Sequence, residues 1–292
     1  MKKETLARIY LISSMTVFGT IGVFVRNIAL SSGEIALWRA VLAALLIGVY
    51  LLVTRQKLDL SGMGGELILL VLSGVAMGFN WILLFEAYKY TTVSVATLSY
   101  YFAPVIVTLL CPILFKEKMR AGQWICFAAS TVGLVLITGI GDVSSGSSHI
   151  KGILFGLGAA GLYATVILLN KSIRKIGGIH RTFLQFLAAI AVLLVYVLLS
   201  GGFKLASLPA DGWIYLLIVG ILHTGITYCL YFSSLGELSG QEAAILSYID
   251  PLVAVIISIT LLGESMSWQQ LLGGALILGF TLWNECSEAG RK

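Results

Sequence analysis

The stretch Leu98-Ser-Tyr-Tyr-Phe-Ala-Pro-Val-Ile-Val-Thr-Leu-Leu-Cys-Pro-Ile-Leu-Phe-Lys-Glu-Lys-Met119 carries the pattern on which the fold depends. It joins aromatic residues before a proline to an apolar run and a charged end. The stretch Leu246-Ser-Tyr-Ile-Asp-Pro251, continued by Leu261-Leu-Gly-Glu-Ser-Met266, repeats that pattern. At one constant offset, Tyr101, Pro104, Leu114, Glu117, Met119, Gln123 and Ala128 match Tyr248, Pro251, Leu261, Glu264, Met266, Gln270 and Ala275. A shorter series pairs Phe18, Thr20, Arg26 and Ile28 with Tyr163, Thr165, Lys171 and Ile173. The chain therefore contains two related halves.

The composition around these repeats is that of a membrane protein. Of the 292 residues, 58% are hydrophobic and 11% are charged, whereas soluble domains carry about 25% charged residues. A helix needs roughly 20 apolar residues to cross the hydrocarbon core. The spans predicted on this basis are 8–28, 34–53, 66–88, 93–114, 122–139, 151–171, 180–200, 211–233, 241–261 and 268–286. We predict an all-α integral membrane protein with ten transmembrane helices and one membrane domain over residues 1–292.

The spans divide into two sets of five. The polar stretch 139–148 lies at the midpoint and predicts a connector between a first repeat over 1–139 and a second over 151–286. Because five is an odd number, the second repeat is expected to be inverted relative to the first, around a central cavity, as in secondary transporters. Capping boxes at Ser31–Glu34, Ser239–Glu242 and Ser267–Gln270 support three of the predicted helix starts.

The basic residues predict the orientation. With the N-terminus inside, Arg26, Arg39, Lys89, Lys151 and Lys204 fall on the outer half, and the other fourteen of the 19 basic residues fall inside. This is a strong positive-inside signal, and it predicts that both termini are cytoplasmic. The net charge of +5 is explained by topology, so no nucleic-acid partner is expected. We expect a multi-pass protein of a bacterial cytoplasmic (inner) membrane.

The residues quoted above, with Gly273-Gly274 after Gln270, resemble the EamA-type carriers of the drug/metabolite transporter superfamily over essentially the whole chain. The resemblance implies a ten-helix fold whose central cavity is lined by helices 1, 3, 4, 6, 8 and 9. It also implies alternating-access transport of small organic metabolites, with amino acids or related compounds and export favoured. The alternatives are a carrier or flippase-like transporter of a nucleotide-sugar, of choline or a vitamin, or of a lipid-linked head group.

Ionisable groups deep in a span are functional candidates, because their insertion costs roughly 2.5 to 3.5 kcal/mol. By helix rise, Asp250 lies about 14 Å and His223 about 18 Å into their spans. Asp250 is either a cap for the helix that Pro251 interrupts or a substrate and proton site with His223 as its partner. His223 is alternatively an interhelical hydrogen-bonding residue. Arg39, shallower in its span, is interpreted mainly as a topological or ion-pairing residue that extends to the interface, with substrate carboxylate contact as the alternative.

A set of aromatic and small polar residues is expected to line the cavity. Each residue alone is better explained by interhelical hydrogen bonds or interfacial aromatic belts, whereas the set together favours a binding surface. The predicted substrate-binding residues are Asn80, Trp81, Tyr100, Tyr101, Tyr163, Thr165, His223, Thr227, Tyr228, Tyr248 and Asp250.

Enzymatic motifs do not stand out in the sequence. The four cysteines have no metal-ligand spacing, and there is no HExxH, no paired carboxylates and no Gly-rich phosphate loop. We therefore expect no catalytic residues, no metal, no cofactor and no enzyme activity. The expected partners are a small-molecule substrate and the lipid bilayer, with protons as a candidate third. Monomer and dimer both remain open.

Overall fold

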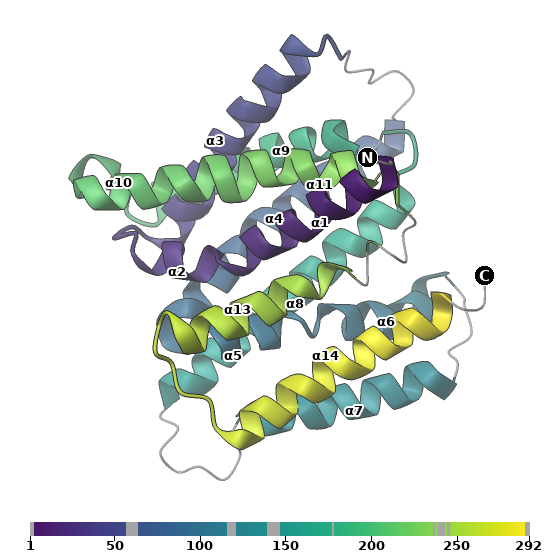
Figure 1. The fold of residues 1–292 in the computed structure, drawn as a ribbon. Helices are drawn as coiled ribbons and strands as arrows, with labels where there is room; N and C mark the ends of the chain where they lie inside the picture. Colours follow the sequence, from purple (N-terminus) through teal and green to yellow (C-terminus); the bar gives the residue numbers. More distant parts are fainter. Residues whose placement is uncertain are drawn as a thin grey trace.

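The computed structural model describes residues 3–56, 64–115, 121–138, 147–176, 178–235, 237–238, 243 and 246–289, and within these ranges every regular element is a helix (Figure 1). The first half contributes α1 (Lys3–Gly19), α2 (Ile21–Arg26), α3 (Ser32–Val53), α4 (Gly64–Tyr90), α5 (Val93–Tyr100), α6 (Ala103–Phe115) and α7 (Ala121–Thr138). The second half contributes α8 (Ser147–Ser172), α9 (Gly178–Leu199), η1 (Leu205–Ser207), α10 (Ala210–Leu217), η2 (Ile218–Ile226), α11 (Thr227–Leu235), α13 (Ile249–Thr260) and α14 (Trp268–Ala289).

The predicted spans coincide with these elements. Helices α1 and α2 form the first span, α5 and α6 the fourth, and α10, η2 and α11 the eighth. Much of the start of the ninth span, 241–248, lies outside the described residues, and α13 forms its remainder. Within the described ranges, seven helical stretches are long and apolar enough to cross a bilayer, and two shorter apolar helices accompany them. The all-α, ten-helix prediction is confirmed.

The helices of the two halves interleave in a repeating pattern. Helix α4 packs against α8 and α9, and in the same way the eighth-span elements α11 and η2 pack against α1 and α3. The contacts of α8 with α5 and α6 correspond to the contact of α1 with α13. Other cross-half contacts join equivalent helices: α3 with α9, α5 with α13, and α7 with α14. Smaller contacts join α5 with α14 and α7 with α8. The contacts are thus those of two five-helix repeats related by a two-fold axis.

Three of the spans are irregular. Thr20 separates α1 from α2, and Tyr101 and Phe102 separate α5 from α6. In the ninth span Leu246 and Ser247 are helical, Tyr248 is a turn residue, and α13 starts at Ile249. The two later breaks therefore fall at the matched tyrosines, three residues before the matched prolines. This placement is the one a proline tolerates, since its missing N–H lies in the first turn of the new helix.

Side chains cap two of the predicted helix starts. Ser31 Oγ accepts from Glu34 N at 3.2 Å, but the Glu34 carboxylate accepts from the Lys204 amide at 2.6 Å instead of completing the box. At α14 the box is complete, because Gln270 N donates to Ser267 Oγ and Ser267 N donates to Gln270 Oε1. The third predicted box, Ser239–Glu242, lies outside the described residues.

Helices α7 and α14 form a pair at the edge of the bundle (Figure 1). A Cβ added to Gly273 would lie 2.4 Å from the Gly133 carbonyl oxygen, and one added to Gly133 would lie 2.6 Å from that of Gly273. The two backbones approach this closely because neither residue has a side chain.

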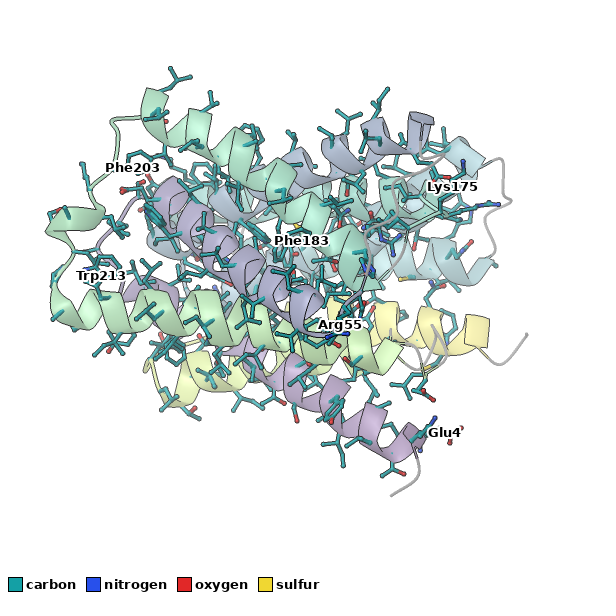
Figure 2. The ribbon with its side chains drawn as sticks, turned by 90° about the horizontal axis from the view of Figure 1, so that it is seen from above. Glu4, Arg55, Lys175, Phe183, Phe203 and Trp213 are labelled. Atoms are coloured by element: carbon teal, nitrogen blue, oxygen red, sulfur yellow. The ribbon has the colours of Figure 1, made fainter. Side chains whose placement is uncertain are left out.

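Residues predicted to lie near opposite sides of the membrane are found at opposite ends of the bundle. Figure 2 shows Phe203 and Trp213 toward one end and Glu4 and Lys175 toward the other. Phe203 belongs to a predicted outer loop and Trp213 to the outer end of the predicted span 211–233, whereas Glu4 precedes the first predicted span and Lys175 belongs to a predicted inner loop. The fold therefore groups these residues as the topology prediction requires, while the direction of the bundle in the membrane stays a prediction.

Candidate functional site

A cavity of about 180 Å³ lies among the helices of both halves. Its lining comes from spans 1, 3, 4, 6, 8 and 9, with one further residue, Arg39, from span 2. Among the described residues, the lining is Met15, Phe18, Gly19, Ile21, Arg39, Met77, Asn80, Trp81, Leu84, Tyr88, Thr97, Tyr100, Tyr101, Tyr163, Val166, Tyr228, Tyr231, Ser247, Asp250 and Ala254. The expected set of cavity helices is thus the observed one, extended by a single arginine.

Seven of the eleven predicted binding residues lie around this cavity. They are Asn80, Trp81, Tyr100, Tyr101, Tyr163, Tyr228 and Asp250. They come from α4, α5, α8, α11 and α13, and Tyr101 follows directly after α5. The packing of these helices brings the seven residues together. Their role in binding stays a prediction.

The other four predicted residues lie elsewhere. Thr165 is exposed and donates back to Gly161 O on its own helix at 2.9 Å. Thr227 is buried and donates to Leu222 O at 2.6 Å. Tyr248 is absent from the central lining and borders an apolar pocket between α5, α13 and α14. Helical rotation explains these placements, because a residue one or two positions from a cavity-facing residue lies on a different face.

His223 lies behind the cavity wall and is not part of the lining. Its Nε2 is 2.8 Å from Thr20 Oγ1, at the break between α1 and α2, and its Nδ1 is 3.3 Å from Ile218 O. The side chain is 1% exposed. This arrangement matches the alternative in which His223 is an interhelical hydrogen-bonding residue. No contact with Asp250 is found among the described residues, so the expected His223 partnership is not seen.

Asp250 faces the cavity from the first turn of α13. Its Oδ2 accepts a hydrogen bond of 2.6 Å from the Tyr101 hydroxyl, the tyrosine at the matched break in the other half. Within the described residues, no backbone amide donates to its carboxylate. The capping alternative is therefore not what the structure shows. The partner of Asp250 is a phenol from the other half of the chain.

Aromatic rings make up much of the surface near this carboxylate. The ring centroids of Tyr100 and Tyr163 are 5.3 Å apart, and those of Tyr100 and Tyr101 are 5.8 Å apart. Across the cavity, Phe18 and Tyr228 pack edge to face at 5.2 Å. Such rings supply flat apolar surfaces, and their hydroxyls supply hydrogen bonds.

Asn80 has a structural task as well as a place in the lining. Its amide Nδ2 donates to the Ala159 carbonyl on α8 at 2.7 Å, within a buried contact between the two halves. The amide thus fixes α4 against α8 at cavity depth. Its Oδ1 has no hydrogen-bond partner among the described residues, and this oxygen is the part of Asn80 that a cargo can use.

Two lining residues stand outside the predicted binding set: Arg39, which the sequence interpretation assigned mainly to the interface, and Tyr88, which it did not name. Arg39 is 4% exposed, so it does not extend to the interface as expected. Its Nε donates to Thr224 Oγ1 at 3.1 Å, and its guanidinium lies 4.5 Å from the Trp81 ring centroid. Tyr88 shares a face of α4 with Met77, Trp81 and Leu84. The three-to-four-residue spacing of this face was a signal available in the sequence.

One end of the cavity helices is joined by a polar network around Glu264, just after α13. Its carboxylate forms an ion pair with Arg26 at the end of α2 and accepts from Ser258 and, at 2.9 Å, from the Val93 amide at the start of α5. Arg26 also donates to the carbonyls of Tyr88 and Thr91 at 3.1 and 2.6 Å. Spans 1, 3, 4 and 9 thus meet at the end predicted to lie outside.

Comparisons with known proteins agree with this architecture. A model of the EamA-like transporter family matches residues 5–139 and 150–284. The uncharacterized transporter YxxF of Bacillus subtilis is 32% identical over 277 residues, covering 94% of this chain and 88% of that protein. An uncharacterized transporter of Archaeoglobus fulgidus is 28% identical over 280 residues, covering 94% and 95%. One solved crystal structure covers 98% of this chain and 99% of its own, with a TM-score of 0.66 at 16% identity, which supports the fold alone.

Proposed function

The chain belongs to the EamA-like transporter family, and from this premise we propose that it is a secondary transporter that exports small organic metabolites by alternating access. We propose amino acids or related compounds as the cargo. The observation that carries the proposal is a cavity, lined by both repeats, whose described lining residues include one carboxylate among aromatic rings.

The proposed route runs through this cavity because three of the spans around it, the first, the fourth and the ninth, are interrupted. Breaks at Thr20, at Tyr101–Phe102 and at Tyr248 place irregular backbone beside the lining. In membranes such irregular backbone is tolerated where it lines a cavity. We propose repeat boundaries of 1–139 and 151–286, a cytoplasmic-membrane location and cytoplasmic termini.

Amino acids suit the groups that the cavity offers. Hydroxyls of Tyr100, Tyr101 and Tyr228 can orient a polar cargo, and the rings can receive an apolar side chain. Cargoes with several negative charges suit it less, because Arg39 is the one basic side chain among the described lining residues. This favours amino acids over the nucleotide-sugar and lipid-linked alternatives.

The test is a substrate screen in proteoliposomes that contain the full chain. We expect saturable flux of a radiolabelled neutral or aromatic amino acid, with competition from other members of that class and none from inorganic ions. Protein-free liposomes are the control for leakage. Saturable flux of phosphorylated sugars without amino-acid competition would replace the proposed cargo. A comparison of right-side-out and inverted vesicles tests the direction of export.

A further inference from the structure

The cavity contains a guanidinium that the fold leaves without an anion. Arg39 reaches the lining from α3, in a span that otherwise contributes none of the described lining residues. It is buried, and among the described residues no carboxylate oxygen lies within 4.0 Å of its nitrogens. We infer that Arg39 is the anion-binding residue of the cavity, and that the cargo is held as a dipolar ion with its carboxylate on Arg39 and its cationic group at Asp250.

The surroundings of Arg39 orient it without neutralising it. Nε donates to Thr224 Oγ1 at 3.1 Å, and Thr224 in turn donates to Val219 O within the π-helix η2. The guanidinium carbon lies 4.5 Å from the Trp81 ring centroid and 5.3 Å from that of Phe85. These contacts occupy the Nε edge and one face of the Arg39 guanidinium. Nη1 and Nη2 make no hydrogen bond to the described residues.

A guanidinium presented in this way matches a carboxylate. Arg stays protonated and offers two parallel N–H groups to the two oxygens of a carboxylate or phosphate. Cation–π contacts contribute less to stability than burying an ion costs. An anionic ligand offsets the remaining cost of burying the guanidinium, so the site favours an anion.

A side chain of the opposite charge belongs to the same lining. Arg39 and Asp250 are its one basic and one acidic side chain among the described residues, and they do not form an ion pair with each other. Because this assignment rests on the proposed transport function, its test must separate the site from the cargo class.

Four matched probes separate the two charges. L-Phenylalanine carries both, 3-phenylpropanoate carries the anion, 2-phenylethylamine carries the cation, and 3-phenylpropanamide carries neither. Binding to the purified full chain in detergent is measured by isothermal titration calorimetry. For the wild-type chain we expect phenylalanine to bind roughly tenfold or more tightly than either singly charged probe, as expected for one charged hydrogen-bonded contact.

Arg39→Gln should weaken phenylalanine and 3-phenylpropanoate roughly tenfold or more while changing 2-phenylethylamine little. The matched control is Arg181→Gln, which removes a partly buried arginine whose Nη1 donates to Asn170 O and Ile173 O away from the cavity. It should leave the order of the four probes unchanged. If Arg39→Gln does not fold, Thr224→Val keeps the charge but releases Nε, and it should weaken the two carboxylates selectively.

The outcomes separate the two proposals. If wild type binds phenylalanine but the Arg39 and Thr224 variants keep its preference for carboxylates, the Arg39 assignment is wrong and amino-acid transport stands. If wild type binds 3-phenylpropanoate and not phenylalanine, and Arg39→Gln abolishes that binding, the assignment of Arg39 as the anion-binding residue is supported and the dipolar cargo is contradicted. Binding of 2-phenylethylamine alone, or of none of the probes, overturns both.

Discussion

At the scale of single residues, the two opposite charges of the cavity have different kinds of partner. Asp250 receives a hydroxyl hydrogen bond from Tyr101 across the interface between the halves. Arg39 has a hydroxyl at one edge and rings near its face. The Asp250 carboxylate, which accepts one hydrogen bond from a phenol, can gain a proton with little rearrangement, whereas the Arg39 guanidinium keeps its charge. Asp250 is therefore the residue whose protonation can be coupled to helix movement.

The first prediction concerns that coupling. Asp250→Asn keeps the size of the side chain and can still accept from Tyr101, but it cannot gain or lose a proton. We expect the variant to fold and insert, and to lose the pH dependence of transport or of substrate affinity. Flux in proteoliposomes over a series of pH values measures this.

Tyr101→Phe is the matched control for the Asp250 prediction. It removes the 2.6 Å hydrogen bond and keeps both the ring and the carboxylate, so it should retain a pH dependence. An Asn variant that transports with the wild-type pH profile would show that Asp250 is not the coupling residue.

At the scale of the elements, three of the cavity spans, the first, the fourth and the ninth, are interrupted along their length and joined at one end. The breaks at Tyr101 and Tyr248 lie beside the cavity, while the Glu264 network holds the ends of α2, α4 and α5 together. An interrupted span can bend where its backbone hydrogen bonds are missing. In alternating access, that network must then separate whenever the cavity opens toward the same end.

The second prediction is that Glu264→Gln loosens this end. Gln keeps the shape but removes the ion pair with Arg26, and a hydrogen bond to a charged group contributes about 1.5 to 3 kcal/mol. We expect a cysteine placed at Met77 in a cysteine-free background to react several-fold faster with an impermeant maleimide from the outer side. Glu86→Gln breaks the exposed 2.8 Å pair with Lys89 and serves as the control. Equal labelling rates in both variants would count against a gating role.

The third prediction concerns the α7–α14 pair. Gly273→Ala places a methyl 2.4 Å from the Gly133 carbonyl oxygen, so the helices must separate. Overpacking of this kind costs about 1 to 3 kcal/mol, and we expect a lower midpoint of thermal unfolding in detergent. Gly279→Ala on the same helix meets nothing within 4 Å and should change the midpoint little. A Gly273→Ala protein as stable as the Gly279→Ala protein would mean that the contact is not tight in solution.

At the scale of the whole molecule, many contacts between helices of the first and second halves occur twice, with the roles of the halves exchanged. The main contacts between spans of opposite halves have counterparts after exchange of the halves. The cavity lies between the two halves, where Tyr101 of the first half donates a hydrogen bond to Asp250 of the second. A carrier built in this way can present the same site to either side by exchanging the conformations of its halves.

The fourth prediction is the topology that this exchange requires. A single cysteine at position 145 should react with an impermeant reagent added outside intact cells, and one at position 175 should react only after permeabilisation. The charge distribution and the odd number of spans per repeat are the reasons. External labelling of position 175 in intact cells would contradict the inverted arrangement.

The ten helices, the duplication and the helices around the cavity could be predicted from the sequence. These features follow from apolar span length, matched prolines at 104 and 251, and the family pattern around Glu264. They are local or periodic properties, since hydrocarbon leaves the backbone few structures other than a helix.

Tertiary packing alone decided which faces meet. It placed the Tyr101 hydroxyl on Asp250, directed Thr165, Thr227 and Tyr248 away from the central lining, and kept His223 behind the wall at Thr20. It also brought Arg39 inward over Trp81, whereas position along the span alone suggested the interface. Helix rotation and side-chain reach set these contacts, and both depend on neighbours far away in the sequence.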